Sequence, residues 1–420
     1  MKIEKITLKN FKSFGPLTNT WDNTIDSFSN INMLFGYNNS GKSNLIKFLQ
    51  LVFQSKGRLS KITVEEEVIE RRENSPFWKG HIDNAQYIFH KNKRDIPVDF
   101  EIVIRISDAD IKKSEYSHYK KLNAIYLKMK TGNRAVKEDY KLILKGQIKK
   151  LDDFDTAEII INEGKLNGHE IYSIDSKGKF IYFQNAPTGK TNDLKSDGTA
   201  FENLLAIFED STLFLDNNRY LDNPRLPDFE GPIALTPGNY KNWLYSQYIN
   251  PKTNHIFEEL KEFIKNNKIT TNGKDESSFK EVEGFSLFPN FNPEFADVNG
   301  QKELMFRIDG KRLPLSSFGT GLHQILYILT VIIISKAKWI LIEELELNLS
   351  PRYQRALFHI LKNLIDTGRI NQVFFTTHSK SFTFRKDFSI YEISMNSSGS
   401  SKATKVNQTR ANKYFEKRID

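Results

Sequence analysis

The stretch "NMLFGYNNSGKSNLIKFLQLVF", residues 32–53, joins an apolar run, a loop rich in Gly, Asn and Ser, and a second apolar pattern. Residues 31–36 end in glycine and are typical of a buried strand. The apolar residues of 42–55 recur at the three- and four-residue spacing of a helix. Residues 36–43 fit the pattern G-x-x-x-x-G-K-[ST], and a strand before the loop with a helix after it is the context that a phosphate-binding loop requires.

The residue types of this loop suit a triphosphate. Its glycines let backbone N–H groups close around phosphates, and the helix N-terminus faces their negative charge. Lys42 is expected to reach the β and γ phosphates, and the Ser43 hydroxyl to ligate Mg²⁺. The alternative is a chance match in a turn, which the flanking strand and helix disfavour. ATP and Mg²⁺ are the expected cofactors, and the candidate nucleotide-binding residues of the loop are Gly36, Asn38, Asn39, Ser40, Gly41, Lys42, Ser43 and Asn44.

A second stretch, "WILIEELELNLSP" at 339–351, ends an apolar strand in Glu343 and Glu344. In a Walker-B arrangement the first carboxylate holds Mg²⁺ and the second polarises the attacking water as general base. Two adjacent carboxylates repel, and a divalent cation relieves that repulsion. The alternative is an ordinary acidic strand end, which would be preferred if the phosphate loop were absent.

A third stretch, "VFFTTHSKSF" at 373–382, ends another apolar strand in Thr376, Thr377 and His378. His378 follows the glutamate pair by one strand–helix unit, so we expect it at the same edge of the sheet, able to bond a γ-phosphate or orient the water. A lone histidine is more commonly structural, and that interpretation remains open.

A fourth stretch, "LSSFGTGLHQIL" at 315–326, places small residues before a long helix. This is a second helix N-terminus suited to an anion, although Ser and Thr also serve as plain helix caps. Because one phosphate loop is already complete, the second N-terminus suggests use in trans, on the nucleotide of another subunit. The candidate residues are Ser316, Ser317, Gly319, Thr320 and Gly321.

Composition narrows the class of protein. The chain has 420 residues, 39% of them hydrophobic and none cysteine, which allows one large or two modest domains and excludes disulfides and thiolate metal sites. No apolar run reaches the length of a membrane span, and the N-terminus lacks the apolar segment of a signal peptide. We therefore expect a cytoplasmic protein without membrane contact.

Charge is concentrated in one part of the chain. The net charge is +9, and residues 120–150 hold ten Lys or Arg against two acidic residues. A basic patch suggests a polyanionic partner. A solvated, lysine-rich surface is the alternative, and the sequence does not separate the two.

The order of patterns predicts an α/β fold in four segments. These are an N-terminal lobe with the phosphate loop (1–83), a β-rich insertion or arm (84–235), a connecting region of helices and strands (236–313), and a C-terminal lobe (314–420). The last segment alternates helix 321–335, strand 338–343, helix 350–366 and strand 371–376. Residues 396–405, "NSSGSSKATK", read as a flexible turn or linker before a basic tail.

Together these stretches resemble the ABC-type ATPase head shared by the SMC, RecF and OLD families. "LKNFKSFGP" near the N-terminus is similar to the first strand of such heads, which implies that Lys12 and Ser13 lie near the nucleotide. The resemblance implies a two-lobed P-loop fold. It departs from the families in having Glu343 for the usual aspartate and Leu345 for a proline. The stretch "LSSFGTGLHQ" is similar to the signature motif of such heads, and this signature-like segment can be aligned with the motif in more than one register. The glutamine of the Q-loop is likewise not fixed, and Gln86 is a candidate.

The resemblance also implies an assembly and a role. Such heads hydrolyse ATP where one subunit's signature closes on another's phosphate loop, so a homodimer or higher homo-oligomer is expected. Compact OLD-like heads without a nuclease are typical of anti-phage defence, where they control a separate effector, a nuclease or toxin. Asp108-Ala109-Asp110 falls in the β-rich region rather than after a late strand, so no nuclease site is expected here. The alternatives are a RecF-like DNA-repair ATPase that binds DNA directly, and a non-hydrolysing scaffold.

Overall fold

The computed structural model describes residues 1–16, 23–53, 69–71, 79–82, 85–107, 140–151, 156–174, 180–182, 208, 211–216, 240–266, 294–298, 301–308, 311–335, 337–383 and 388–417. The acidic pair at 108–110 and the basic residues of 120–139 lie outside these ranges.

A six-stranded sheet forms the centre of the molecule. Its order is β11-β15-β16-β3-β17-β18, and every neighbouring pair is parallel except β17 and β18. The strands are β11 (Thr212–Leu215), β15 (Trp339–Ile342), β16 (Gln372–Thr376), β3 (Ile31–Phe35), β17 (Ser389–Met395) and β18 (Ser401–Val406). Strands β3, β11, β15 and β16 are buried at every residue, as expected for parallel strands covered on both faces.

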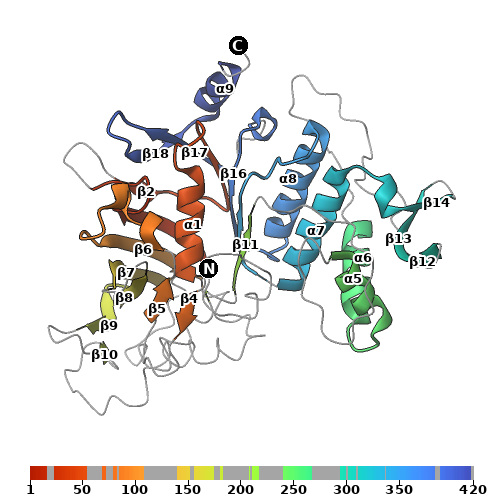
Figure 1. Cartoon of the computed structure of the whole chain (residues 1–420), viewed down its shortest axis with the longest axis horizontal. Helices are drawn as coiled ribbons and strands as arrows, with labels where there is room; N and C mark the ends of the chain where they lie inside the picture. The colour runs from red at the N-terminus through yellow and green to blue at the C-terminus, as the bar shows by residue number, and fades with distance from the viewer. Residues whose placement is uncertain are drawn as a thin grey trace, which may run out of the picture.

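Helices cover both faces of this sheet (Figure 1). Helix α1 (Lys42–Phe53) lies on one face, and α7 (Thr320–Ser335) and α8 (Pro351–Asp366) lie on the other. Alternate residues of one strand enter different cores: Leu34 packs with the residues of α1, whereas Met33 packs with those of α7 and α8. The α/β rhythm predicted for the C-terminal third is thereby confirmed, and the strands and helices begin and end within one or two residues of the expected positions.

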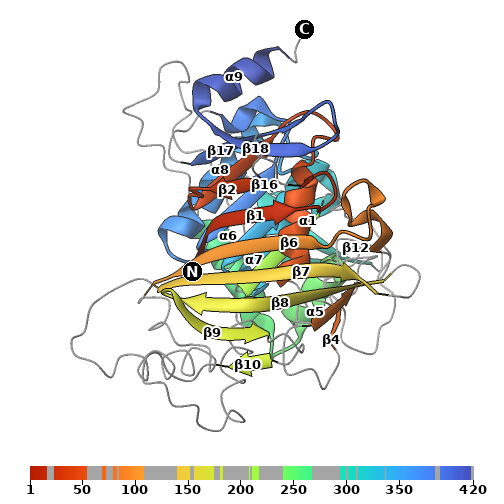
Figure 2. The ribbon, with the colours of Figure 1, turned by 90° about the vertical axis from the view of Figure 1, so that its left-hand side faces the viewer.

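A second, antiparallel sheet covers the other side of α1 (Figure 2). Its order is β10-β9-β8-β7-β6-β1-β2, with β5 and β4 added at β8. The strands are β1 (Lys2–Lys9), β2 (Thr24–Asp26), β4 (Ile69–Arg71), β5 (Lys79–Ile82), β6 (Val98–Ile106), β7 (Tyr140–Lys150), β8 (Ala157–Leu166), β9 (His169–Ile174) and β10 (Phe180–Tyr182). Phe48 of α1 meets Phe100 of β6 with ring centroids 5.4 Å apart. Because β6 pairs with β1, much of the predicted insertion continues the N-terminal sheet; the four-segment division stays a prediction.

Helices and a small sheet pack at the far side of α7 (Figure 1). They comprise α5 (Tyr240–Ile249), α6 (Asn254–Asn266) and the antiparallel strands β12 (Glu294–Val298), β13 (Gln301–Ile308) and β14 (Lys311–Pro314). The described residues also form short 3-10 helices, which are η2 (Ala85–Tyr87), η3 (His90–Asn92), η4 (Leu315–Ser317) and η5 (Lys380–Phe382). Within the described ranges no helix has the length and hydropathy to cross a membrane.

The C-terminal segment corrects one prediction. Residues 396–405 were expected to be a flexible turn or linker, but only the first part is a turn, and Ser401–Val406 form β18. The basic tail contains helix α9 (Gln408–Glu416). Tyr414 of α9 packs edge-on against Phe35, the last residue of β3, with centroids 4.8 Å apart. The polar composition of the segment concealed a role as an edge strand, whose side chains need only partial burial.

Candidate functional site

Four parallel strands end at the same edge of the central sheet. The carboxyl ends of neighbouring parallel strands form the usual ligand site of such sheets. Here β3 leads into loop 36–41 and α1, β15 into Glu343 and Glu344, β16 into Thr377 and His378, and β11 into Asp216. The structure therefore brings the phosphate loop, the glutamate pair and the histidine together at one edge.

The phosphate loop has the backbone shape that its glycines predict. Gly41 has a φ of +102°, and a Cβ there would lie 2.3 Å from the Ser13 hydroxyl oxygen and 2.5 Å from that of Ser401. A side chain at this position would be both strained and crowded. Lys42 is buried, and its ammonium donates to the carbonyls of Gly36 at 3.1 Å and Tyr37 at 2.9 Å. The ammonium is thus held inside the loop, while Asn38 and Asn39 are exposed at its tip.

The N-terminal turn supports this loop from the side. Ser13 accepts a hydrogen bond from the side chain of Asn44 at 2.7 Å through its hydroxyl. Its carbonyl accepts the N–H of Ser401 at 2.7 Å, and the Ser401 hydroxyl donates to the Ser40 carbonyl at 2.5 Å. Lys12, in the left-handed region at φ 46°, precedes this contact. The expectation that Lys12 and Ser13 lie near the loop agrees with this geometry, although their contact with a nucleotide stays a prediction.

Glu343 provides a buried carboxylate beside the start of α1. It is 5% exposed, and the Ser43 hydroxyl hydrogen-bonds to it. Burial raises the pKa of its carboxyl above the ordinary value; the Lys47 charge and the Ser43 hydrogen bond oppose this rise, and the charges of Asp216 and Glu344 add to it. A cation bound beside this carboxylate would add to the Lys47 charge in favouring its ionised form.

These oxygens fit Mg²⁺. Carboxylate and hydroxyl oxygens are its preferred protein ligands, and Mg²⁺ normally takes only one or two of them beside phosphate and water oxygens. The described residues contain no group of three or more acidic, His or Cys side chains arranged to hold a metal alone. Ser43 and Glu343, with Asp216 nearby, therefore suit a cation that arrives together with phosphates.

Glu344 and His378 follow adjacent strands. The backbone N–H of Glu344 donates to the hydroxyl of Thr376, the last residue of β16, at 2.8 Å. The backbone N–H of His378 donates to Glu346 at 2.5 Å. The two candidate catalytic side chains therefore stand on segments that are hydrogen-bonded to each other.

The signature-like segment is exposed. Ser316, Ser317, Gly319 and Thr320 are solvent-exposed, whereas the next residue, Gly321, is buried. A Cβ at Gly321 would lie 2.8 Å from the carbonyl of Asn348, so this glycine allows α7 to approach the loop that follows the glutamates. The ring of His323 contacts the Leu315 carbonyl at 2.6 Å and fastens the η4 turn to the first turn of α7.

Asp216 and Ser401 were missed by the sequence reasoning. Asp216 directly follows the apolar run "TLFL", a signal that could have placed it at a strand end, but not beside Glu343. Ser401 lies in a polar stretch and gave no signal. Gln86, the candidate for the Q-loop, lies in η2 rather than at the end of a strand of the central sheet.

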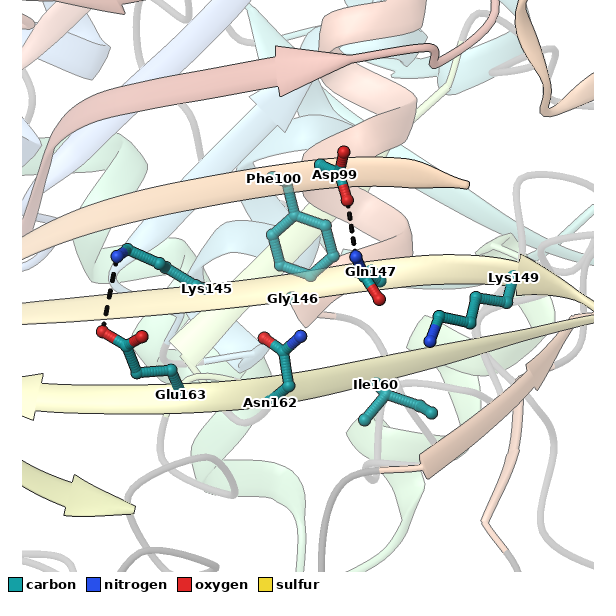
Figure 3. A pocket seen from close by; sticks show the side chains of 9 residues that line it. All are labelled: Asp99, Phe100, Lys145, Gly146, Gln147, Lys149, Ile160, Asn162 and Glu163. Carbon is teal, nitrogen blue, oxygen red and sulfur yellow. Dashed lines mark hydrogen bonds and ion pairs between the residues drawn. The ribbon is translucent and has the colours of Figure 1, made fainter. Parts of the chain in front are cut away.

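A cavity of about 490 Å³ lies elsewhere, on the antiparallel sheet (Figure 3). The register of β7 and β8 shifts at Gly146, and a Cβ there would lie 2.2 Å from the ring of Phe100. The two acidic residues that line the cavity are already paired. Glu163 lies 3.4 Å from the Lys145 ammonium, and Asp99 accepts the Gln147 amide at 2.7 Å. The lining comes from β6, β7 and β8, and shares no residue with the strand ends described above.

Comparison with known proteins assigns a family. The AAA ATPase domain family matches residues 1–383. A Helicobacter pylori protein named ATP/GTP phosphatase is 24% identical over 388 residues, covering 90% of this chain and 86% of that protein. A structural maintenance of chromosomes protein 3 homolog of Plasmodium falciparum is 21% identical over 287 residues, covering 67% of this chain but only 22% of the relative.

Two solved structures are similar to this chain at low identity. The SMC head domain from Thermotoga maritima gives a TM-score of 0.45 at 15% identity, covering 97% of this chain and 100% of that one. An SmcHead bound to the C-winged helix domain of ScpA gives 0.47 at 14% identity, covering 98% and 100%.

The chain belongs to the AAA ATPase domain family, because the match spans most of its length. The predicted α/β fold and the predicted ATPase class are thereby confirmed. The roles of individual residues, the dependence on Mg²⁺ and the part played in the cell stay predictions.

Proposed function

We propose that this AAA-family ATPase binds ATP with Mg²⁺ at loop 36–43 and hydrolyses it with Glu344 as general base. One observation carries the proposal most directly: the Ser43 hydroxyl, at the start of α1, hydrogen-bonds to the Glu343 carboxylate at the end of β15. These residues are 300 positions apart in the sequence, and a hydroxyl and a carboxylate in contact are the pair expected to share one cation.

Each group at the sheet edge has a distinct task in this proposal. The N–H groups of the loop and the Lys42 ammonium bind the phosphates. A cation held by Ser43 and Glu343 would neutralise charge that develops on the phosphate oxygens. Glu344 accepts a proton from the attacking water, and His378 hydrogen-bonds the γ-phosphate.

A second copy of the chain completes the site in this proposal. The signature-like residues are exposed at the N-terminus of a 16-residue helix, α7, where backbone N–H groups are free to meet an anion. The same copy already has a phosphate loop with its own helix. A symmetric dimer would bring each signature to the partner's loop and form two composite sites.

In the cell, we assign the protein the role of an ATP-gated sensor or scaffold in the cytoplasm that controls a separate effector, a nuclease or toxin, in anti-phage defence. The sequence resemblance supports this role. A RecF-like ATPase that binds DNA directly is the second candidate. The observation that favours it is the set of lysines on β7, of which Lys141, Lys149 and Lys150 are exposed.

Mixing two inactive variants tests the composite site. Lys42→Ala removes the phosphate-loop ammonium, and Ser317→Glu places a negative charge on the signature. Each variant alone should release little phosphate. A random mixture should regain about a quarter of wild-type activity, because half of the dimers are mixed and one of their two sites is intact. No recovery, with wild-type activity proportional to monomer concentration, would refute the composite site.

Phosphate release by the wild-type protein discriminates between the two cellular roles. A severalfold increase in its rate on adding duplex or gapped DNA would favour the DNA-repair hypothesis. A rate that is unaffected by DNA but responds to a co-purified effector would favour the sensor.

A further inference from the structure

The ends of β15 and β16 are joined by two reciprocal hydrogen bonds. Thr376, on β16, accepts the backbone N–H of Glu344 at 2.8 Å through its hydroxyl. Glu346, from the loop after β15, accepts the backbone N–H of His378 at 2.5 Å. Each segment thus supplies a side chain that fixes the backbone of the other, next to a residue proposed to act on ATP.

The backbone of Glu344 requires such support. Its φ is 47°, in the left-handed region that residues other than glycine adopt only at a cost. The bond to Thr376 and the neighbouring bond from the Leu345 N–H to the Thr376 carbonyl, at 3.1 Å, hold this conformation. Thr376 is only 1% exposed, so water does not replace its hydroxyl.

Glu346 is bound more tightly than a surface carboxylate would be. Besides the N–H of His378 it receives the hydroxyl of Thr377, and Thr377 in turn accepts the N–H of Ser379 at 2.9 Å. Its second oxygen, Oε2, is buried and has no hydrogen-bond partner among the described residues. An acidic side chain of intermediate exposure with one buried, unpartnered oxygen carries a desolvation cost.

We propose that Thr376 and Glu346 are positioning residues that form a reciprocal clamp and set the distance between Glu344 and His378. The inference rests on the proposed function, since it assigns the clamp to the step in which water attacks the γ-phosphate. Among the described residues, the side-chain hydrogen bonds given for Thr376 and Glu346 reach only the segments that follow β15 and β16. We therefore expect the clamp to act mainly on the rate of hydrolysis rather than on the binding of ATP. A misplacement of about 1 Å at a reacting group can lower a rate by about a hundredfold.

Two pairs of variants separate the hydrogen bonds from the shape of the side chains. Thr376→Val keeps the shape and removes the acceptor, whereas Thr376→Ser keeps the hydroxyl. Glu346→Ala removes the acceptor, whereas Glu346→Gln keeps one accepting oxygen. Thr330→Val is the matched control, because Thr330 is fully buried and its hydroxyl contacts that of Tyr240 at 3.0 Å in the middle of α7. It loses a buried hydrogen bond away from the strand ends.

We expect Thr376→Val and Glu346→Ala to lower kcat at least tenfold with KM for ATP within about twofold of wild type. Thr376→Ser and Glu346→Gln should recover most of that loss. The double variant Thr376→Val with Glu346→Ala should lose less than the product of the single losses, because both bonds hold the same spacing. Thr330→Val should lower thermal stability comparably and leave kcat unchanged.

Amide hydrogen exchange gives a readout that does not depend on turnover. In Glu346→Ala the His378 amide should exchange about tenfold faster, and in Thr376→Val the Glu344 amide should do so. Unchanged exchange, an unchanged kcat, or a loss of kcat that Thr330→Val reproduces would overturn the clamp. If the wild-type protein hydrolyses no ATP, the proposed function fails by itself. The exchange rates still decide whether the clamp exists.

Discussion

Ser401 lies behind the phosphate loop, and replacing it tests whether β18 supports nucleotide binding. Its hydroxyl is fully buried and donates to the Ser40 carbonyl at 2.5 Å, while its N–H donates to the Ser13 carbonyl at 2.7 Å. Ser401→Ala removes the first bond and keeps the second. The Ser40 carbonyl then lacks that buried donor, which costs about 1–3 kcal/mol.

The cost should appear mainly as weaker ATP binding. The loop must hold its N–H groups in place to close around phosphates, and Ser401 fixes the carbonyl of the residue just before Gly41. If the binding conformation bears the whole cost, the Kd for ATP rises by about 5- to 150-fold. The kcat at saturating ATP should change little, since the Ser401 bonds to Ser40 and Ser13 reach the phosphate loop and the N-terminal turn rather than the ends of β15 and β16.

Isothermal titration with a slowly hydrolysed ATP analogue and Mg²⁺ measures this effect. The matched control is Ser398→Ala, because Ser398 is exposed and its hydroxyl donates to Asn396 at 2.7 Å within the turn before β18. A Kd for Ser401→Ala within twofold of wild type would refute the claim that β18 supports the loop. An equal effect in the control would do the same.

Three further outcomes are expected at the sheet edge. Glu344→Gln should lower kcat by about 10²- to 10⁴-fold and leave ATP-dependent dimers that mass photometry detects; wild-type turnover in this variant would instead indicate a scaffold. Asp216→Ala should weaken Mg²⁺ affinity about tenfold in a metal titration of turnover, with ATP-only binding unchanged. Because the pKa of Glu343 is raised, its ionisation destabilises the fold as pH rises above about 4.5. Glu343→Gln should therefore raise the metal-free melting temperature by a few degrees at pH 8, with the gain fading towards pH 4.

The sequence predicted those parts of the candidate site whose residues are neighbours along the chain. The loop with Lys42 carries its glycines, its lysine and the start of its helix within a dozen residues. Glu343 and His378 each follow an apolar run that is buried at every position. Because parallel strands align their carboxyl ends, the order strand, helix, strand was sufficient to predict that these groups meet.

The parts that were missed depend on contacts between distant segments. Asp216 reaches the site only because β11 pairs with β15 at the sheet edge. Ser401 contacts the loop because the polar edge strand β18 pairs antiparallel with β17 and begins beside Ser40. Hydrophobic periodicity indicates which face of a helix or strand is buried. Neither of these residues belongs to a strongly periodic segment. Local patterns therefore predicted which candidate groups lie at one edge of the sheet, but not the residues that support them.

The residues that follow β15 carry several features that lower the stability of the fold. Burial raises the pKa of both Glu343 and Glu346, because their surroundings disfavour the charged form of the carboxyl group. Apolar residues flank them, and Leu345 between them is fully buried, so the strand end could have been built without charge. Glu344 adds a strained backbone at the same place. Three unfavourable features thus lie within four consecutive residues, and carboxylates with perturbed pKa values are common at functional sites. These costs in stability support the proposal that this turn takes part in the reaction.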